Sequence, residues 1–181
     1  MNPSTLAPHF YALSQALPQA WKNGGGTTRE LLAWPPSAQG TNDWQLRVSV
    51  ADITKDGAFS HFAGVHRAFA VIEGAGVKLQ NLDGWQSVTQ ESEPVNFEGA
   101  DAPDCKLIDG ATTDLNVMWK HGQAAKLTRA YAGESSMSRG FYSLVDCGLW
   151  WQGSKPSAPW SAPPTTLFKT GSHIGWWIDF I

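Results

Sequence analysis

An alternation of apolar and polar residues with a period of two limits most strongly which folds are open to this sequence. In residues 44–51 the even-numbered positions are apolar, whereas the odd-numbered ones include Arg47 and Ser49. Successive side chains of an extended strand point to opposite faces, so this segment predicts a half-buried strand. Long stripes with the 3.6-residue period of an amphipathic helix do not recur along the chain. We therefore predict an all-β fold.

Further short strands are expected between residues rich in Gly, Pro, Asn and Asp. Residues 67–73 are apolar on both faces in their middle and predict a strand buried between two layers. Asp83-Gly84 predicts a tight hairpin between strands at 77–82 and 85–89. The remaining predicted strands cover 28–33, 95–98, 105–108, 115–120, 126–131, 140–145, 149–152, 165–169 and 174–180, with a helical turn at 15–20 and a surface loop at 154–164.

Size and composition exclude several classes of function. A chain of 181 residues is long enough for one domain, or for two small barrels that share a core. With a net charge of −3 and no basic run, we expect no nucleic-acid partner. No apolar stretch approaches the roughly 18–20 residues that cross a bilayer, and the N-terminus lacks a secretory signal. We expect a cytoplasmic protein in which Cys105 and Cys147 are reduced thiols.

The glycine-rich segment from Trp21 to Leu31 is the first candidate for a functional site. Its three consecutive glycines let backbone approach a ligand closely, but no lysine follows at the spacing of a phosphate-binding loop. No G-x-G-x-x-G joins a strand to a helix there either. Two interpretations stay open: a wide turn that leads into a strand, or a polar site built from Asn23, Thr28 and Glu30 beside an aromatic ring.

Two histidines in the second candidate segment, residues 51–67, raise the question of a metal site. His61 and His66 are five residues apart, which places them on opposite faces of an extended segment. Glu73 lies seven residues after His66, which also differs from the spacing of metal-binding cupins. Because a metal ion needs three or four converging ligands, we expect exposed loop histidines here, with neither a metal nor another cofactor.

Two arginines are stronger candidates for ligand contacts. Arg67 shares a strand face with Phe69 and Glu73, and Arg47 lies on the polar face of its own strand. A guanidinium group presents a planar set of donors that matches a carboxylate. The functional interpretation is an anion clamp in the mouth of a barrel. The structural alternatives are an Arg67–Glu73 pair, an Arg47–Glu30 pair, or simple exposure to solvent.

The order of these motifs resembles that of the HutD/Ves family. The family's first pattern, an aromatic-basic-Asn run that ends in T-x-E-[LI], is matched from Trp21 to Leu31. Its third, D-x-N-[LVI]-M, is matched from Asp114 to Met118. Its second pattern is matched by Trp44, Arg47, Ser49, Ala51, Gly57, Phe59, Ser60, Phe62, Gly64, Arg67 and Gly74. The chain departs from this pattern at Ala63, where the family usually has proline, and at His66, where an acidic residue is common.

The resemblance implies a cupin-like jelly-roll bicupin, in which two antiparallel β-barrels pack side by side. The N-terminal barrel would span approximately 20–120, and the C-terminal barrel approximately 121–181 together with early strands. The family has no established enzymatic activity. Its genes often lie beside those for histidine breakdown, which implies binding of an N-formyl or formimino amino acid, or of urocanate. Other members are associated with stress and cold responses, so the pathway does not transfer automatically.

We favour a binding function without catalysis. The protein would bind a small polar or acidic molecule and regulate histidine degradation. Homodimerisation is left open. A metal-independent isomerase or epimerase is an alternative, for which only His61, His66 and Glu30 offer a general base near the motifs. No nucleophile motif is present, and no catalytic residue is assigned. The third hypothesis is a protein-interaction module, in which the C-terminal tryptophans would form an exposed apolar patch. The predicted ligand contacts are Asn23, Thr28, Glu30, Arg47, Ser49, Phe59, Ser60, Arg67 and Asn116.

Overall fold

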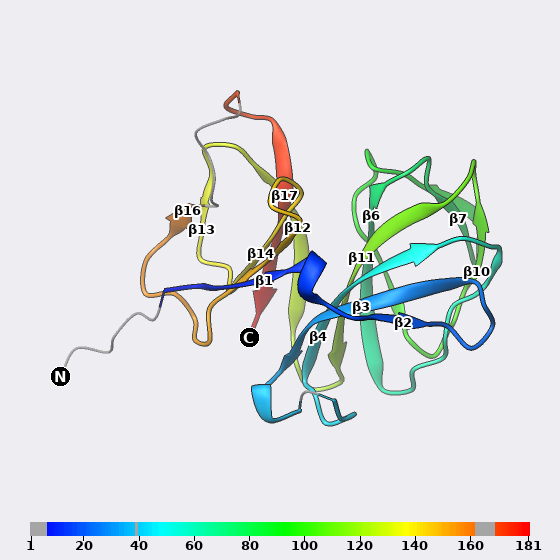
Figure 1. Ribbon diagram of the computed structural model, residues 1–181, viewed down its shortest axis with the longest axis horizontal. Coiled ribbons are helices and arrows are strands. Elements are labelled where there is room, and N and C mark those ends of the chain that lie inside the picture. Colours follow the sequence, from blue (N-terminus) through cyan, green and yellow to red (C-terminus); the bar gives the residue numbers. More distant parts are fainter. Residues whose placement is uncertain (1–6, 39, 162–168) are drawn as a thin grey trace. The chain divides into compact units, whose positions relative to one another are not determined.

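The computed structural model describes residues 7–38, 40–161 and 169–181, and most of these residues lie in antiparallel strands (Figure 1). The all-β prediction is therefore confirmed. The helical segments of this described part are the 3₁₀ turns η1 (Leu13–Gln15) and η2 (Pro36–Ala38), and neither is long enough to cross a membrane. The chain divides into two compact units. One is Ala16–Gln123, and the other combines Ala124–Ile181 with Met1–Gln15, each taken over its described residues.

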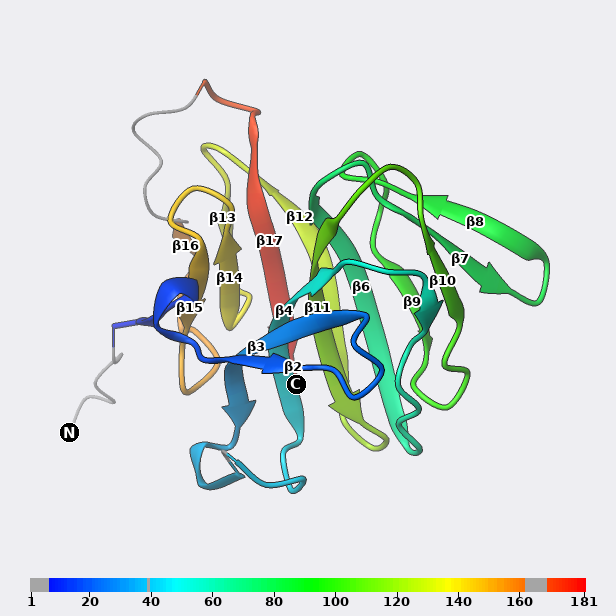
Figure 2. The same cartoon turned by 45° about the vertical axis from the view of Figure 1, so that its right-hand side comes forward.

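Two open sheets form the unit Ala16–Gln123. The six-stranded sheet has the order β2 (Pro18–Ala20), β3 (Gly26–Trp34), β4 (Leu46–Ile53), β11 (Thr112–Lys120), β6 (Val65–Glu73) and β9 (Val95–Glu98). The four-stranded sheet has the order β5 (Gly57–Ala58), β10 (Asp104–Leu107), β7 (Val77–Asn81) and β8 (Gly84–Val88). Figure 2 shows β7, β8 and β10 together at the right of the drawing. Neither sheet pairs its first strand with its last, so the sheets do not close into barrels.

The core of this unit lies between the two sheets. Phe69 and Val71 of β6 pack there with Leu79 of β7, Val88 of β8 and Cys105 of β10. Because side chains alternate along a strand, Arg67 points to the same interior as Phe69 and Val71. This parity is what places a charged group beside an apolar core.

Strand β4 corrects one prediction, because it is buried on both faces rather than on one. Val48 and Val50 are 0% exposed, and Ser49 and Ala51 on the other face are 3% and 2% exposed. The alternation in the sequence therefore reports the polarity of the two faces and not their exposure. The polar face turns toward the interior of the unit, where Ser49 and Arg47 border a cavity.

The second unit contains a five-stranded sheet in the order β1 (His9–Ala12), β15 (Gly148–Trp151), β14 (Gly140–Ser143), β17 (His173–Phe180) and β12 (Ala125–Tyr131). A small sheet pairs β13 (Ser135–Ser136) with β16 (Trp160–Ser161). Phe141 and Trp177 are buried in this unit's core, with their ring centroids 5.0 Å apart. The predicted C-terminal strand is thus confirmed as β17, docked between β14 and β12.

The other predicted strands within the described residues are present; β9 (Val95–Glu98) has the predicted bounds, and the ends of the rest are shifted. The helical turn predicted at 15–20 is wrong, because η1 ends at Gln15 and β2 follows at Pro18–Ala20. The predicted loop at 154–164 contains β16, and its residues beyond Ser161 lie outside the described part. The predicted strand at 165–169 also lies outside it, apart from Lys169. The strands that the sequence did not reveal have two to four residues, too few for periodicity to register.

Gly26 should be required at the start of β3. A Cβ atom at Gly26 would lie 2.2 Å from the backbone oxygen of Asp52, whereas a Cβ at Gly57 would have only Asn23 Nδ2 nearby, at 3.7 Å. We expect Gly26→Ala to lower the free energy of unfolding by about 1–3 kcal/mol, as overpacking does. The matched change Gly57→Ala should stay within about 0.5 kcal/mol of wild type. Urea unfolding measures both, and equal stability of the two variants would contradict this packing.

Candidate ligand-binding site

A cavity of about 190 Å³ opens within the unit Ala16–Gln123. The predicted ligand contacts that line this cavity are Thr28, Arg47, Ser49, Phe59, Ser60, Arg67 and Asn116. Asn23 and Glu30 do not line it. The lining residues that the sequence analysis did not name as contacts include Gln19, Trp21, Phe62 and Met118.

Strand register brings the two arginines together. Met118 of β11 pairs with Arg47 of β4 on one side and with Arg67 of β6 on the other. Residues directly opposite one another in an antiparallel ladder have side chains on the same face, so both guanidinium groups belong to the cavity face. Asn116 lies two residues before Met118 and shares that face.

Arg67 is the most buried charged group in the cavity wall, with 6% of the residue exposed. Its Nε donates a hydrogen bond of 2.6 Å to Asn116 Oδ1, and its guanidinium carbon lies 4.2 Å from the centre of the Phe59 ring. Among the described residues, its terminal nitrogens have no hydrogen-bond partner, and no carboxylate pairs with it within 4.0 Å. The Arg67–Glu73 pair and the exposed Arg67, both left open by the sequence, are therefore wrong.

Arg47 differs from Arg67 because it has a carboxylate partner. Its Nε donates to Glu30 Oε2 at 2.6 Å, which is one of the structural alternatives that the sequence left open. Glu30 holds this arginine in place and does not itself line the cavity. The terminal nitrogens of Arg47 have no hydrogen-bond partner within the described ranges. The interpretation of two equivalent clamping arginines is therefore corrected: only Arg67 lacks a directly bonded counter-ion.

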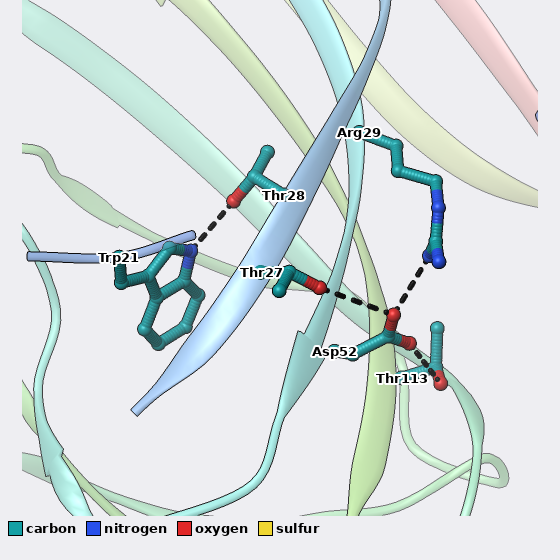
Figure 3. A network of polar contacts seen from close by, with 6 residues as sticks. All are labelled: Trp21, Thr27, Thr28, Arg29, Asp52 and Thr113. Atoms are coloured by element: carbon teal, nitrogen blue, oxygen red, sulfur yellow. Dashed lines mark hydrogen bonds and ion pairs between the residues drawn. The ribbon is translucent and has the colours of Figure 1, made fainter. Parts of the chain in front are cut away.

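The glycine-rich segment is a turn, and part of it reaches the cavity. Trp21 N donates to Gly26 O at 2.9 Å, and Asn23 Oδ1 accepts from Gly25 N at 2.9 Å, so Asn23 stabilises the turn. The indole of Trp21 donates from Nε1 to Thr28 Oγ1 at 2.7 Å, which fixes an aromatic wall of the cavity (Figure 3).

The opposite face of β3 carries a separate polar network, also drawn in Figure 3. Arg29 Nη1 lies 2.7 Å from Asp52 Oδ2, and the hydroxyls of Thr27 and Thr113 also donate to this carboxylate. Arg29 thus forms a direct ion pair with the Asp52 carboxylate. Arg29 can therefore be compared with Arg67, an arginine of the same sheet that has no directly bonded carboxylate among the described residues.

Asp114 is a functional candidate that sequence reasoning missed. Its carboxylate accepts a hydrogen bond from Asn116 Nδ2, and its other oxygen has no partner in the described part of the chain although the residue is 0% exposed. Burial raises the pKa of Asp114 to about 7, against the opposing effects of Arg67 and the Asn116 hydrogen bond. The Asp-x-Asn spacing was the available signal, because it places both side chains on one face of a strand.

Burial lowers the pKa of Arg67, whereas it raises the pKa of Asp114. It lowers the pKa of Arg67 to about 10, with Asp114 opposing this shift and Arg47 adding to it. Arg67 therefore remains charged near neutral pH, whereas Asp114 is only partly ionised. Around pH 7 and below, the cavity face thus carries net positive charge.

Neither histidine of the second motif lines the cavity. His61 is exposed, and His66 lies on the face of β6 opposite to Arg67. The cavity lining holds no histidine, cysteine, aspartate or glutamate among the described residues. Its chemistry is that of arginine, amide, hydroxyl and aromatic groups.

The protonation of Asp114 predicts a distinctive dependence of stability on pH. Between about pH 4 and pH 7 the folded state keeps a proton that the unfolded state has lost, so wild-type stability falls as pH rises through this window. Asp114→Asn removes that penalty, and its stability relative to wild type should grow from pH 4.5 to pH 8, by at most about 4 kcal/mol. Thermal and urea unfolding at both pH values measure this. A constant difference, or the same trend in the exposed control Asp43→Asn, would contradict a buried protonated carboxyl.

Comparisons with known proteins agree with this arrangement of motifs. The HutD family model matches residues 14–145. Protein Ves of Citrobacter koseri is 33% identical over 138 residues, which cover 75% of this chain and 71% of that protein. An uncharacterized 21.2 kDa protein in the hutC 3′ region of Pseudomonas putida is 38% identical over 105 residues, 55% of this chain and 51% of the relative.

Two solved structures resemble the fold over nearly its whole length. HutD from Pseudomonas fluorescens SBW25 superposes with a TM-score of 0.76 at 22% identity, covering 96% of this chain and 98% of that chain. A conserved protein of unknown function from Pseudomonas aeruginosa PAO1 gives a TM-score of 0.73 at 21% identity, covering 95% and 98%. The predicted cupin-like jelly roll is confirmed, with sheets that stay open. On the family model and the Ves relative together, the chain belongs to the HutD family.

Proposed function

We propose that this protein binds a small carboxylate in the cavity, against Arg67, and that binding rather than catalysis is its biochemical role. The observation that carries the proposal is the state of Arg67. Its side chain is buried and lines the cavity, its Nε is held by Asn116, and its terminal nitrogens have no partner among the described residues. A buried guanidinium with unused donors is incomplete until an acceptor reaches it.

The electrostatic balance favours an anion of one or two charges. Arg47 is paired with Glu30, and Asp114 is partly protonated because burial raises its pKa to about 7. Bound carboxylate would accept two parallel hydrogen bonds from Arg67 and relieve its repulsion with Arg47. Because the carboxyl of such a ligand stays ionised well below pH 7, binding should strengthen as Asp114 gains its proton.

Cavity size and lining narrow the ligand further. About 190 Å³ is less than the roughly 300–1,000 Å³ of pockets for drug-sized molecules, so the ligand is small. Phe59 and Met118 supply apolar walls, while Ser49 and Ser60 supply hydroxyls. This combination suits a short acid that also carries a polar group, such as a formyl or formimino amino acid or urocanate.

A role in regulating histidine degradation follows from the family and remains a proposal for this chain. The Pseudomonas putida relative is named for its place in the hutC 3′ region, which supports a link to that pathway. The proposed ligand would then be an intermediate whose level the protein senses. The cytoplasmic location, the homodimer and the absence of a nucleic-acid or membrane partner likewise stay predictions.

The alternatives named from the sequence gain no specific support from geometry. None of the three candidate general bases, His61, His66 and Glu30, lines the cavity. Trp151 and Trp177 are 2% and 4% exposed, so these tryptophans do not supply an apolar docking patch. Ligand binding is therefore the function that the site supports best.

Thermal shift with defined acids tests the proposal. Formate, succinate, N-formyl-L-glutamate and urocanate should be compared at 1 mM, where a micromolar Kd would stabilise the protein by about 4 kcal/mol. Arg67→Lys keeps the charge but loses the bidentate geometry, so it should weaken binding at least tenfold. The matched control Arg29→Lys, whose parent arginine pairs with Asp52 on the opposite face of the sheet, should bind as wild type does.

Two outcomes would overturn the proposal. One is the absence of a shift with every acid in the series. The other is equal affinity of Arg67→Lys and wild type, measured by titration calorimetry.

A further inference from the structure

Three potential metal ligands meet at one end of the six-stranded sheet. His66 Nδ1 lies 2.6 Å from Glu98 Oε1, and His121 Nε2 lies 2.9 Å from Glu98 Oε2. The three ligand atoms lie within 4.8 Å of one another, and the two imidazole centroids are 4.5 Å apart. Each side chain is at least one third exposed, so solvent ions reach the cluster.

Backbone pairing fixes the positions of all three residues. His66 of β6 pairs directly with Glu98 of β9. His121 follows the end of β11, and its backbone N–H donates to Gly64 O at 3.0 Å, so the turn that carries it is tied to β6. Trp119 packs against the His66 ring at 5.6 Å between centroids. Two of the three residues thus lie in paired strands, and the third lies in a turn that a backbone hydrogen bond ties to the start of β6.

This cluster is separate from the cavity. His66 and Arg67 are consecutive on β6 and therefore point to opposite faces of the sheet. None of the three cluster residues lines the cavity. The three cluster residues therefore lie outside the cavity, although Arg67 also lines the hollow beside them.

We propose that His66, Glu98 and His121 bind a divalent transition-metal ion, with Zn²⁺ as the expected ion. Two imidazole nitrogens and one carboxylate are a ligand set that zinc takes in proteins, at about 2.0–2.2 Å. Tetrahedral geometry at those lengths separates neighbouring ligand atoms by about 3.3 Å. To reach this value the two histidine–carboxylate separations, 2.6 and 2.9 Å, would lengthen slightly, and all three ligand atoms already lie within 4.8 Å of one another.

Three protein ligands leave one coordination position for water or another small ligand. A hollow of about 350 Å³ adjoins the cluster and is lined by His66, Arg67, Asn96, Phe97, Glu98, Asp101 and Trp119. It provides room for that fourth ligand, and its lining carries both a negative side chain, Asp101, and a positive one, Arg67. The proposal departs from the sequence-based expectation of no metal, which considered His66 only with His61 and Glu73.

Zinc titration of the chelator-treated full chain tests the site, with a chromophoric competitor to report free metal. Wild type should bind one equivalent of Zn²⁺ with micromolar or tighter affinity. His121→Ala removes an exposed ligand and Glu98→Gln keeps the shape of the side chain but loses the charge; each should weaken binding at least tenfold. The matched control His61→Ala, an exposed histidine outside the cluster, should bind as wild type does.

A second readout keeps the test decisive if a variant folds poorly. Co²⁺ added to wild type should give the visible absorption of a tetrahedral complex, and lowering the pH should weaken binding, because protons compete with the metal for its ligands. Failure of wild type to bind one equivalent would overturn the proposal. So would His121→Ala and Glu98→Gln variants that bind as tightly as wild type.

Discussion

The candidate site depends on one buried charge. The guanidinium group of Arg67 lies between two sheets and has no directly bonded carboxylate among the described residues. Removing an arginine from water costs several kcal/mol unless its donors find partners. Arg67 has Asn116 at Nε and the face of Phe59, and its terminal nitrogens have no partner among the described residues. Arg29 in the same sheet shows the alternative, a direct 2.7 Å pair with Asp52. The difference between these two arginines is the observation on which the proposed carboxylate site rests.

Asp114 and Asn116 explain how the buried charge is tolerated without being cancelled. The amide bridges the two charged groups, accepting from Arg67 and donating to Asp114. Because Asp114 is completely buried, its pKa is raised to about 7, and its proton adjusts the charge of the cavity near neutral pH. Strand register supplies this arrangement: β11 lies between β4 and β6, so its residues pack beside both arginines. The strands β4, β11 and β6 thus determine both the pairing of the sheet and the positions of the charged groups beside the cavity.

Local patterns predicted much of the fold, and distant pairings account for what they missed. The alternation in 44–51 predicted a strand, but burial of both its faces depends on packing that no local pattern encodes. The Arg47–Glu30 pair stayed one of several alternatives because a bulge between Glu30 and Leu32 sets the register there. His66, Glu98 and His121 are far apart in sequence, so only the pairing of β9 and β11 with β6 brings them together.

The position of a bound anion is the observation that most directly separates a ligand clamp from a structural arginine. A crystal structure of the protein grown with succinate would show it. The account predicts a carboxylate in the cavity with its oxygens about 2.7–2.9 Å from the terminal nitrogens of Arg67. A cavity that holds only ordered water, with those nitrogens bonded directly to Asp114, would contradict it.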